Sequence, residues 1–168
     1  SGEIRGVMFE AQVPEGLPEN KEFVLGRDWW VGTDRGDFRK ELERDPVAAF
    51  SRMIGPRLTL SVKDRKADLD ELVREHRPET ELGRGKLPDG RVRLAWASKD
   101  GQHLDVETWL AVGGEGVLSC SANWLRNIGK VVTRVPKAGQ PRPSEKDTAP
   151  DREIVAWLDR FCASVRVT

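Results

Sequence analysis

The stretch that decides the fold is residues 91–124, RVRLAWASKDGQHLDVETWLAVGGEGVLSCSANW, in which two turn signals separate three runs of alternating apolar and polar residues. A period of two is typical of β-strands. The turns are expected at Lys99-Asp100-Gly101, where glycine suits a left-handed position, and at Gly113-Gly114-Glu115. The stretch therefore predicts an antiparallel meander of three strands.

The length of the first turn predicts how the first two strands pair. A three-residue turn sets Leu94 opposite Val106 and Arg93 opposite Glu107. One face of the meander is then apolar and the other polar, so we expect one face in the core and the other mostly in solvent. The apolar set is Val92, Leu94, Trp96, Leu104, Val106, Leu110, Leu118 and Cys120, and the polar set is Arg91, Arg93, His103, Asp105, Glu107, Ser119 and Ser121.

The residues before the meander predict further strands and helices. Alternation predicts strands over 7–13, 22–31 and 58–62, and a hairpin between the first two is one available pairing. Helical spacing predicts a helix within 36–55 and a short helix opened by Asp68 and closed by Pro78. On the short helix, His76 is expected to pack at the core edge. Gly83-Arg84-Gly85 is interpreted as a turn.

The residues after the meander predict a loop and a helix. Residues 126–150 are rich in Pro, Lys and Arg, which indicates a long basic surface loop. From Asp151 onward, helical spacing predicts an amphipathic helix that lies against a sheet face, with Ile154, Trp157, Leu158, Phe161 and Val165 on its apolar stripe. The fold class is therefore α+β: an antiparallel sheet with a C-terminal meander and helices packed on it.

Composition narrows the classes of function. A chain of 168 residues is expected to form a single domain over 1–168. Its 28 basic and 28 acidic side chains cancel, so no overall field attracts nucleic acid, and no nucleic-acid partner is expected. No apolar run is long enough to span a bilayer, and residues 1–5 lack the features of a signal peptide. A membrane connection is expected only through an N-terminal anchor removed upstream.

The two cysteines, Cys120 and Cys162, are expected to face one another across the sheet and the terminal helix. We predict a disulfide that encloses about 40 residues, and two separate buried thiols are the alternative. A disulfide favours an oxidising compartment, so the predicted location is periplasmic, cell-surface or secreted.

Four segments resemble the Mog1/PsbP-like fold family: FEAQVPEG at 9–16, RLTLSV at 57–62, residues 109–122, and FCASVRV at 161–167. The resemblance spans most of the chain and departs from the family pattern in the long basic loop. It implies an α/β/α sandwich. Members of this family are largely non-catalytic: photosystem accessory subunits, a regulator of a nuclear transport GTPase, bacterial lipoproteins and toxin-immunity proteins. The resemblance implies no catalytic residues for this chain.

One local pattern suggests chemistry. His103, Asp105 and Glu107 lie on one face of a strand and could supply three ligands to a divalent ion, or a base beside an acid. Two observations oppose this. Successive residues on one face are about 7 Å apart, which is wide for one small ion, and the predicted register gives Glu107 an ion pair with Arg93. We therefore predict no metal and no cofactor.

Two regions are candidate binding surfaces. Trp29 and Trp30 cannot both face inward from a strand with one buried face, so one indole is expected at the surface beside Arg27 as an interface anchor. The alternative is that an adjacent helix covers both. The second region is the basic loop, which could hold an acidic surface through Arg126, Lys130, Arg134 and Lys137.

The sequence therefore favours a non-catalytic, exported protein-binding domain of the bacterial cell envelope. A toxin-neutralising immunity protein is one specific form of it, and a bacterial lipoprotein is another. The partner is expected to be another protein, either an envelope component or a toxin. The alternative function is a metal-assisted hydrolase that uses His103, Asp105 and Glu107.

Overall fold

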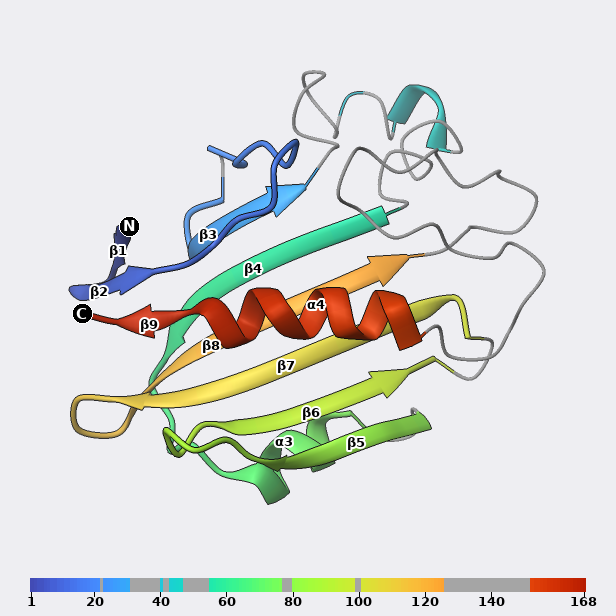
Figure 1. The fold of residues 1–168 in the computed structure, drawn as a ribbon. Helices are drawn as coiled ribbons and strands as arrows, with labels where there is room; N and C mark the ends of the chain where they lie inside the picture. Colours follow the sequence, from blue (N-terminus) through green and yellow to red (C-terminus); the bar gives the residue numbers. More distant parts are fainter. Residues whose placement is uncertain are drawn as a thin grey trace.

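The computed structural model describes residues 1–21, 23–30, 40, 43–46, 55–76, 80–98, 101–125 and 152–168. Within them the architecture is α+β (Figure 1). The predicted helix within 36–55 falls largely outside the described residues, as do Pro78 and the basic loop at 126–150 with Arg126, Lys130, Arg134 and Lys137. None of the helices in the described part of the chain is long and apolar enough to cross a membrane.

Two antiparallel sheets organise these residues. The larger has six strands in the order β3-β4-β8-β7-β6-β5, and the smaller has three in the order β1-β2-β9. The strands are β1 (Gly2–Ile4), β2 (Val7–Glu10), β3 (Gly26–Trp30), β4 (Gly55–Lys63), β5 (Thr80–Lys86), β6 (Val92–Ala97), β7 (His103–Val112), β8 (Gly116–Leu125) and β9 (Arg166–Val167).

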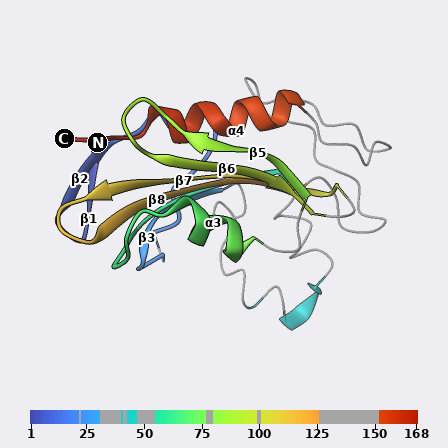
Figure 2. The same cartoon turned by 90° about the horizontal axis from the view of Figure 1, so that it is seen from below.

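Two helices cover opposite faces of the larger sheet. The C-terminal helix α4 (Arg152–Ser164) packs on β7 and β8, and α3 (Leu69–Glu75) packs on β6 from the other side (Figure 2). Asp68 caps α3 by accepting a hydrogen bond from the backbone N–H of Asp70, at 2.9 Å. The predictions of both helices are confirmed.

The meander is confirmed as β6, β7 and β8, but the predicted register between β6 and β7 is wrong by one residue. Leu94 lies opposite Glu107, because Ser98 donates its backbone N–H to the carbonyl of His103 and so makes the loop one residue longer. Side chains alternate between faces along a strand, so a shift of one residue moves every side chain of β6 to the other face.

Both faces of the meander are consequently buried. The face under α4 holds the larger core, which includes Leu58, Leu60, Leu104, Val106, Leu118, Cys120, Trp124, Ile154, Leu158 and Phe161. The face under α3 holds a second core made of Leu72, Val92, Leu94, Trp96, Trp109 and Val117. The expectation of one solvated face is therefore wrong.

The strands outside the meander also differ from the prediction. β2 ends at Glu10 and pairs with β1 and β9, whereas β3 pairs with β4, so β2 and β3 form no hairpin. At Gly26 a Cβ atom would lie 1.9 Å from the carbonyl oxygen of Leu60, so only glycine fits where β3 begins. Gly83-Arg84-Gly85 belongs to the edge strand β5 and is not a turn.

The disulfide between Cys120 and Cys162 is confirmed. It joins β8 to the last turn of α4 within the larger core, where both residues are buried. Arg91 adds a second link at the end of α4. This buried arginine, expected in solvent, donates hydrogen bonds of 2.7 Å to the carbonyls of Cys162 and Val165. The end of α4 is thus held both covalently and by hydrogen bonds.

A variant with Cys120→Ala and Cys162→Ala is expected to lose about 4 kcal/mol of unfolding free energy, because the disulfide closes a loop across 42 residues. Urea unfolding followed by tryptophan fluorescence measures the loss. Wild-type protein unfolded under reducing conditions is the control and should match the variant. Equal midpoints for oxidised and reduced wild-type protein would contradict a bracing role.

Candidate functional site

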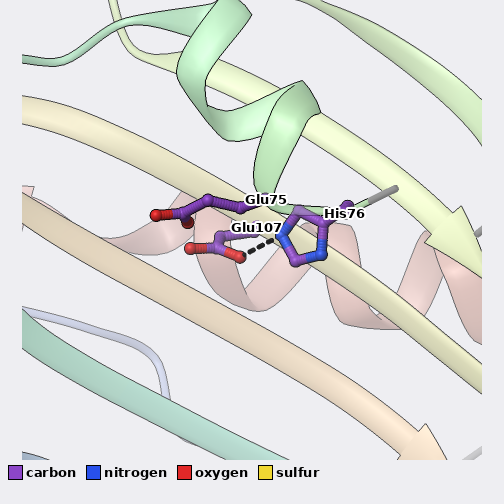
Figure 3. Close-up of side chains that lie close together, drawn as sticks. All are labelled: Glu75, His76 and Glu107. Carbon is purple, nitrogen blue, oxygen red and sulfur yellow. Dashed lines mark hydrogen bonds and ion pairs between the residues drawn. The ribbon is translucent and has the colours of Figure 1, made fainter. Parts of the chain in front are cut away.

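A polar cluster lies where the C-terminal end of α3 meets β7. Glu75 is the last residue of α3, His76 is its C-cap, and Glu107 projects from β7 toward both of them (Figure 3). Glu107 faces α3 because the pleat of β7 places it on the same side as Trp109, inside the second core. The cluster therefore combines one imidazole and two carboxylates from elements distant in sequence.

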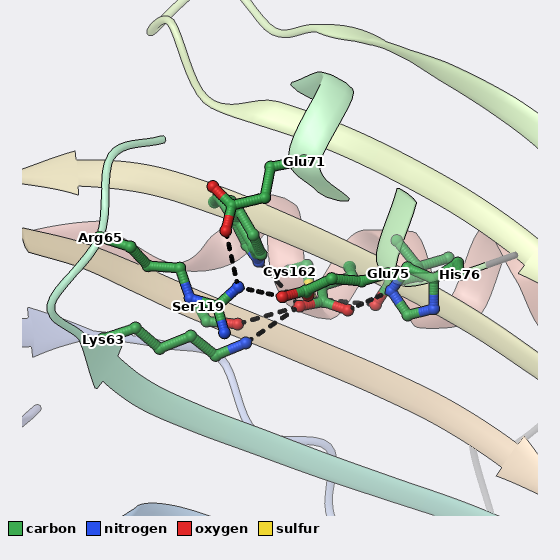
Figure 4. A network of polar contacts seen from close by, with 10 residues as sticks. Lys63, Arg65, Glu71, Glu75, His76, Ser119 and Cys162 are labelled. Carbon is green, nitrogen blue, oxygen red and sulfur yellow. Dashed lines mark hydrogen bonds and ion pairs between the residues drawn. The ribbon is translucent and has the colours of Figure 1, made fainter. Parts of the chain in front are cut away.

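Glu107 is the centre of this cluster and is only 6% exposed. Its Oε2 accepts a 2.7 Å hydrogen bond from Nε2 of His76. Its Oε1 accepts hydrogen bonds from Nε1 of Trp109 at 2.7 Å and from Oγ of Ser119 at 3.3 Å. The ammonium of Lys63 lies 3.6 Å from Oε1 (Figure 4). Both carboxylate oxygens thus have donors, which is the usual requirement for burying a charge.

These contacts determine the protonation of Glu107. Burial alone would raise its pKa, but the hydrogen bonds from His76 and Trp109 and the positive charge of Lys63 outweigh burial, so the pKa lies below the ordinary value. Glu107 is therefore ionised at neutral pH. Since an ionised carboxylate only accepts hydrogen bonds, Nε2 of His76 must be the donor in their shared bond.

The carboxylates of Glu71 and Glu75 flank Arg65 at the rim of the cluster. Arg65 forms ion pairs with Glu75 and Glu71, at 3.2 Å in the case of Glu71. The cationic groups of Lys63 and Arg65 both lie 5.2 Å from the ring centre of Trp109. Two cations thus cover the outer side of the cluster, and both side chains are partly exposed.

Both histidines of the chain contact the indole of Trp96. The ring of His76 stacks on it with centroids 4.7 Å apart, and His103 approaches it edge-on at 5.3 Å. The predicted packing of His76 is confirmed by this contact. Its bond to Glu107 was not foreseen, because it depends on the packing of α3 against β7.

The structure places the three residues of the hydrolase hypothesis, His103, Asp105 and Glu107, in different surroundings. Among the described residues, the group of histidine and acidic side chains close enough to hold one ion is Glu75, His76 and Glu107, which shares only Glu107 with the predicted set. Asp105 and Glu107 are buried, not solvated. The expected ion pair of Arg93 with Glu107 is also wrong, because Arg93 pairs with Asp159 on α4, at 2.7 Å.

Trp29 and Trp30 are both buried, with exposed fractions of 6% and 8%, so the expected surface indole is absent. Trp29 packs edge-on against Phe161 of α4, and Trp30 lies under the guanidinium of Arg57. The reasoning failed because it assumed one covered face, whereas both faces are covered at β3. Arg27, the third predicted residue here, forms an ion pair with Glu19.

An apolar surface lies immediately before β3. Val24 and Leu25 are 90% and 71% exposed, the largest values among the exposed large hydrophobic residues of the described chain. They border a groove of about 380 Å³, lined by Arg5, Phe23, Val24, Leu25, Ser61, Val62 and Lys63. Sequence reasoning missed this surface because it assigned Leu25 to a strand. The available signal in the sequence was Gly26 itself, because glycine within a strand pattern often marks an irregularity or a close backbone approach.

A scan of the sequence against protein-family models finds no matching family, and a search of curated proteins finds no match.

Glu107→Gln is expected to cost about 2 kcal/mol of unfolding free energy at neutral pH, because charged hydrogen bonds are replaced by weaker neutral ones. The lowered pKa of Glu107 stabilises the fold above its ordinary value of 4.5, and this contribution is lost as pH falls through the folded-state pKa. The difference between wild type and variant should therefore shrink in acid. Urea unfolding between about pH 7 and pH 3 measures it.

Glu115→Gln is the matched control, because Glu115 is exposed in the turn between β7 and β8. This change should stay within about 0.5 kcal/mol of wild type at every pH. If Glu107→Gln behaved like Glu115→Gln, the buried network would contribute nothing to stability.

Proposed function

We propose that the chain is a non-catalytic, exported protein-binding domain of the bacterial cell envelope, and that it binds its partner through Val24 and Leu25. The observation that supports this proposal is the exposure of these two neighbouring apolar side chains beside a groove. Exposed apolar residues are ordinary when scattered singly, but a contiguous apolar patch is typical of an interaction site.

The groove also indicates the chemistry of the partner. Arg5 and Lys63 line it together with the apolar side chains of Phe23 and Val62. A partner segment that places an aliphatic or aromatic side chain against Val24 and Leu25, with an acidic residue near Arg5 or Lys63, would fit this lining. A toxin surface of that composition would make the chain an immunity protein.

The scaffold supports the same proposal. A six-stranded antiparallel sheet between α3 and α4 is consistent with the Mog1/PsbP-like fold, a family of largely non-catalytic proteins, although this is an argument by fold analogy. The disulfide supports a periplasmic, cell-surface or secreted location. Buried Trp29 and Trp30 support the patch indirectly, because they anchor the strand that follows it. The basic residues of 126–150 are proposed as a second contact for an acidic partner.

The proposal is tested with a variant that carries Val24→Asp and Leu25→Asp. Immobilised wild-type protein with its disulfide intact should retain a partner from envelope extract of the source organism, whereas the variant should not. The affinity for the purified partner is then measured by calorimetry. We expect a loss of at least about 2 kcal/mol, the size typical of an interface hot spot.

Val167→Asp is the matched control, because Val167 is also an exposed apolar residue but lies on β9, in the smaller sheet. This control should retain the partner with unchanged affinity. Equal affinity of wild type and the Val24, Leu25 variant would exclude this patch as the binding surface.

A further inference from the structure

The cluster at the end of α3 combines an imidazole with two carboxylates, a set of donor groups that the proposed protein binding does not require. We infer that Glu75, His76 and Glu107 bind one divalent transition-metal ion, with Zn²⁺ the best match to their donor atoms. One imidazole nitrogen and two carboxylate oxygens are ligands that Zn²⁺ takes in proteins, and three protein ligands leave a fourth position for water.

The geometry requires side-chain adjustment and the loss of the Nε2 proton of His76, which passes to solvent when the ion binds. One ligand atom from each of the three residues lies within 4.8 Å of the other two. Tetrahedral ligands at about 2.0 Å from zinc are separated by about 3.3 Å. His76 and Glu107 already face one another at 2.7 Å and need to separate slightly to admit the ion (Figure 3). Glu75 is exposed, so its carboxylate can rotate toward them.

The surroundings hold two of the ligands in position. Trp109 and Ser119 donate hydrogen bonds to Oε1 of Glu107, which keeps Oε2 directed at His76. The imidazole of His76 is fixed by stacking on Trp96. Such outer contacts orient metal ligands and commonly contribute tenfold or more to metal affinity.

Two cations compete with the ion for the same carboxylates. Lys63 lies 3.6 Å from Glu107, and Arg65 pairs with Glu75 (Figure 4). Both side chains are partly exposed, so each can turn toward water when an ion arrives. Removing either cation should therefore increase the affinity for the metal ion. If the network were purely structural, removing a cation would lower the stability of the fold and metal ions would have no effect.

Calorimetric titration of the disulfide-intact protein with Zn²⁺ tests the inference, and visible absorption after Co²⁺ addition reports tetrahedral coordination. Wild type should bind one ion. His76→Gln should weaken binding by more than about tenfold, and Ser119→Ala by about tenfold. Lys63→Met should tighten binding. The increase in melting temperature caused by Zn²⁺ should therefore be larger for Lys63→Met than for wild type.

His103→Ala is the matched control, because His103 contacts the same indole but lies outside the ligand group. It should bind Zn²⁺ as wild type does. The inference is overturned if wild type shows no saturable binding, if His76→Gln binds as tightly as wild type, or if His103→Ala abolishes binding. Circular dichroism of each variant confirms that a change in affinity is not due to unfolding.

Discussion

The packing of α4 across β7 and β8 constrains the rest of the structure. Cys162, in the last turn of α4, is bonded to Cys120, and Arg91 holds the carbonyls at the end of the helix. With one sheet face covered in this way, the chain that follows α4 reaches the smaller sheet, where β9 pairs with β2. The opposite face is left to α3, a helix of seven residues whose apolar contacts through Leu69, Leu72 and Val73 leave room for charged side chains beside them.

The two cores consequently differ in chemistry. The core under α4 is closed by a covalent bond, and its buried charge, Arg91, lies at the end of the helix, whereas the core under α3 contains the ionised carboxylate of Glu107. A buried charge is tolerated only when donors satisfy it, and here Trp109, Ser119, His76 and Lys63 come from three strands and a helix end. Such a network is satisfied only when the three strands and the helix end are all in their native positions. It therefore favours this one arrangement of the elements over others.

Periodicity predicted the longer elements but missed β1, β5 and β9, and it did not predict how the elements lie relative to one another. The three meander strands, α3, α4 and the disulfide follow from spacing along the chain. The pairing of β6 with β7 does not, because Gly101 has the expected left-handed backbone while the loop is still one residue longer than its sequence suggests. Because of that single residue, Leu94 lies on the side of the sheet that faces α3, and not on the same side as Val106 as predicted. Contacts such as Lys63 with Glu107 were also invisible, because they join the end of one strand to another strand far along the chain.

The position of the disulfide also has a consequence for proteolysis. Because Cys120 and Cys162 are covalently joined, every peptide bond between them belongs to a closed ring that contains the whole 126–150 segment. A protease that cuts once within this ring opens it without separating the products, and α4 remains attached to β8. In an oxidising compartment the protein would therefore keep its terminal helix after being nicked, and the nick would become visible as two fragments only after reduction.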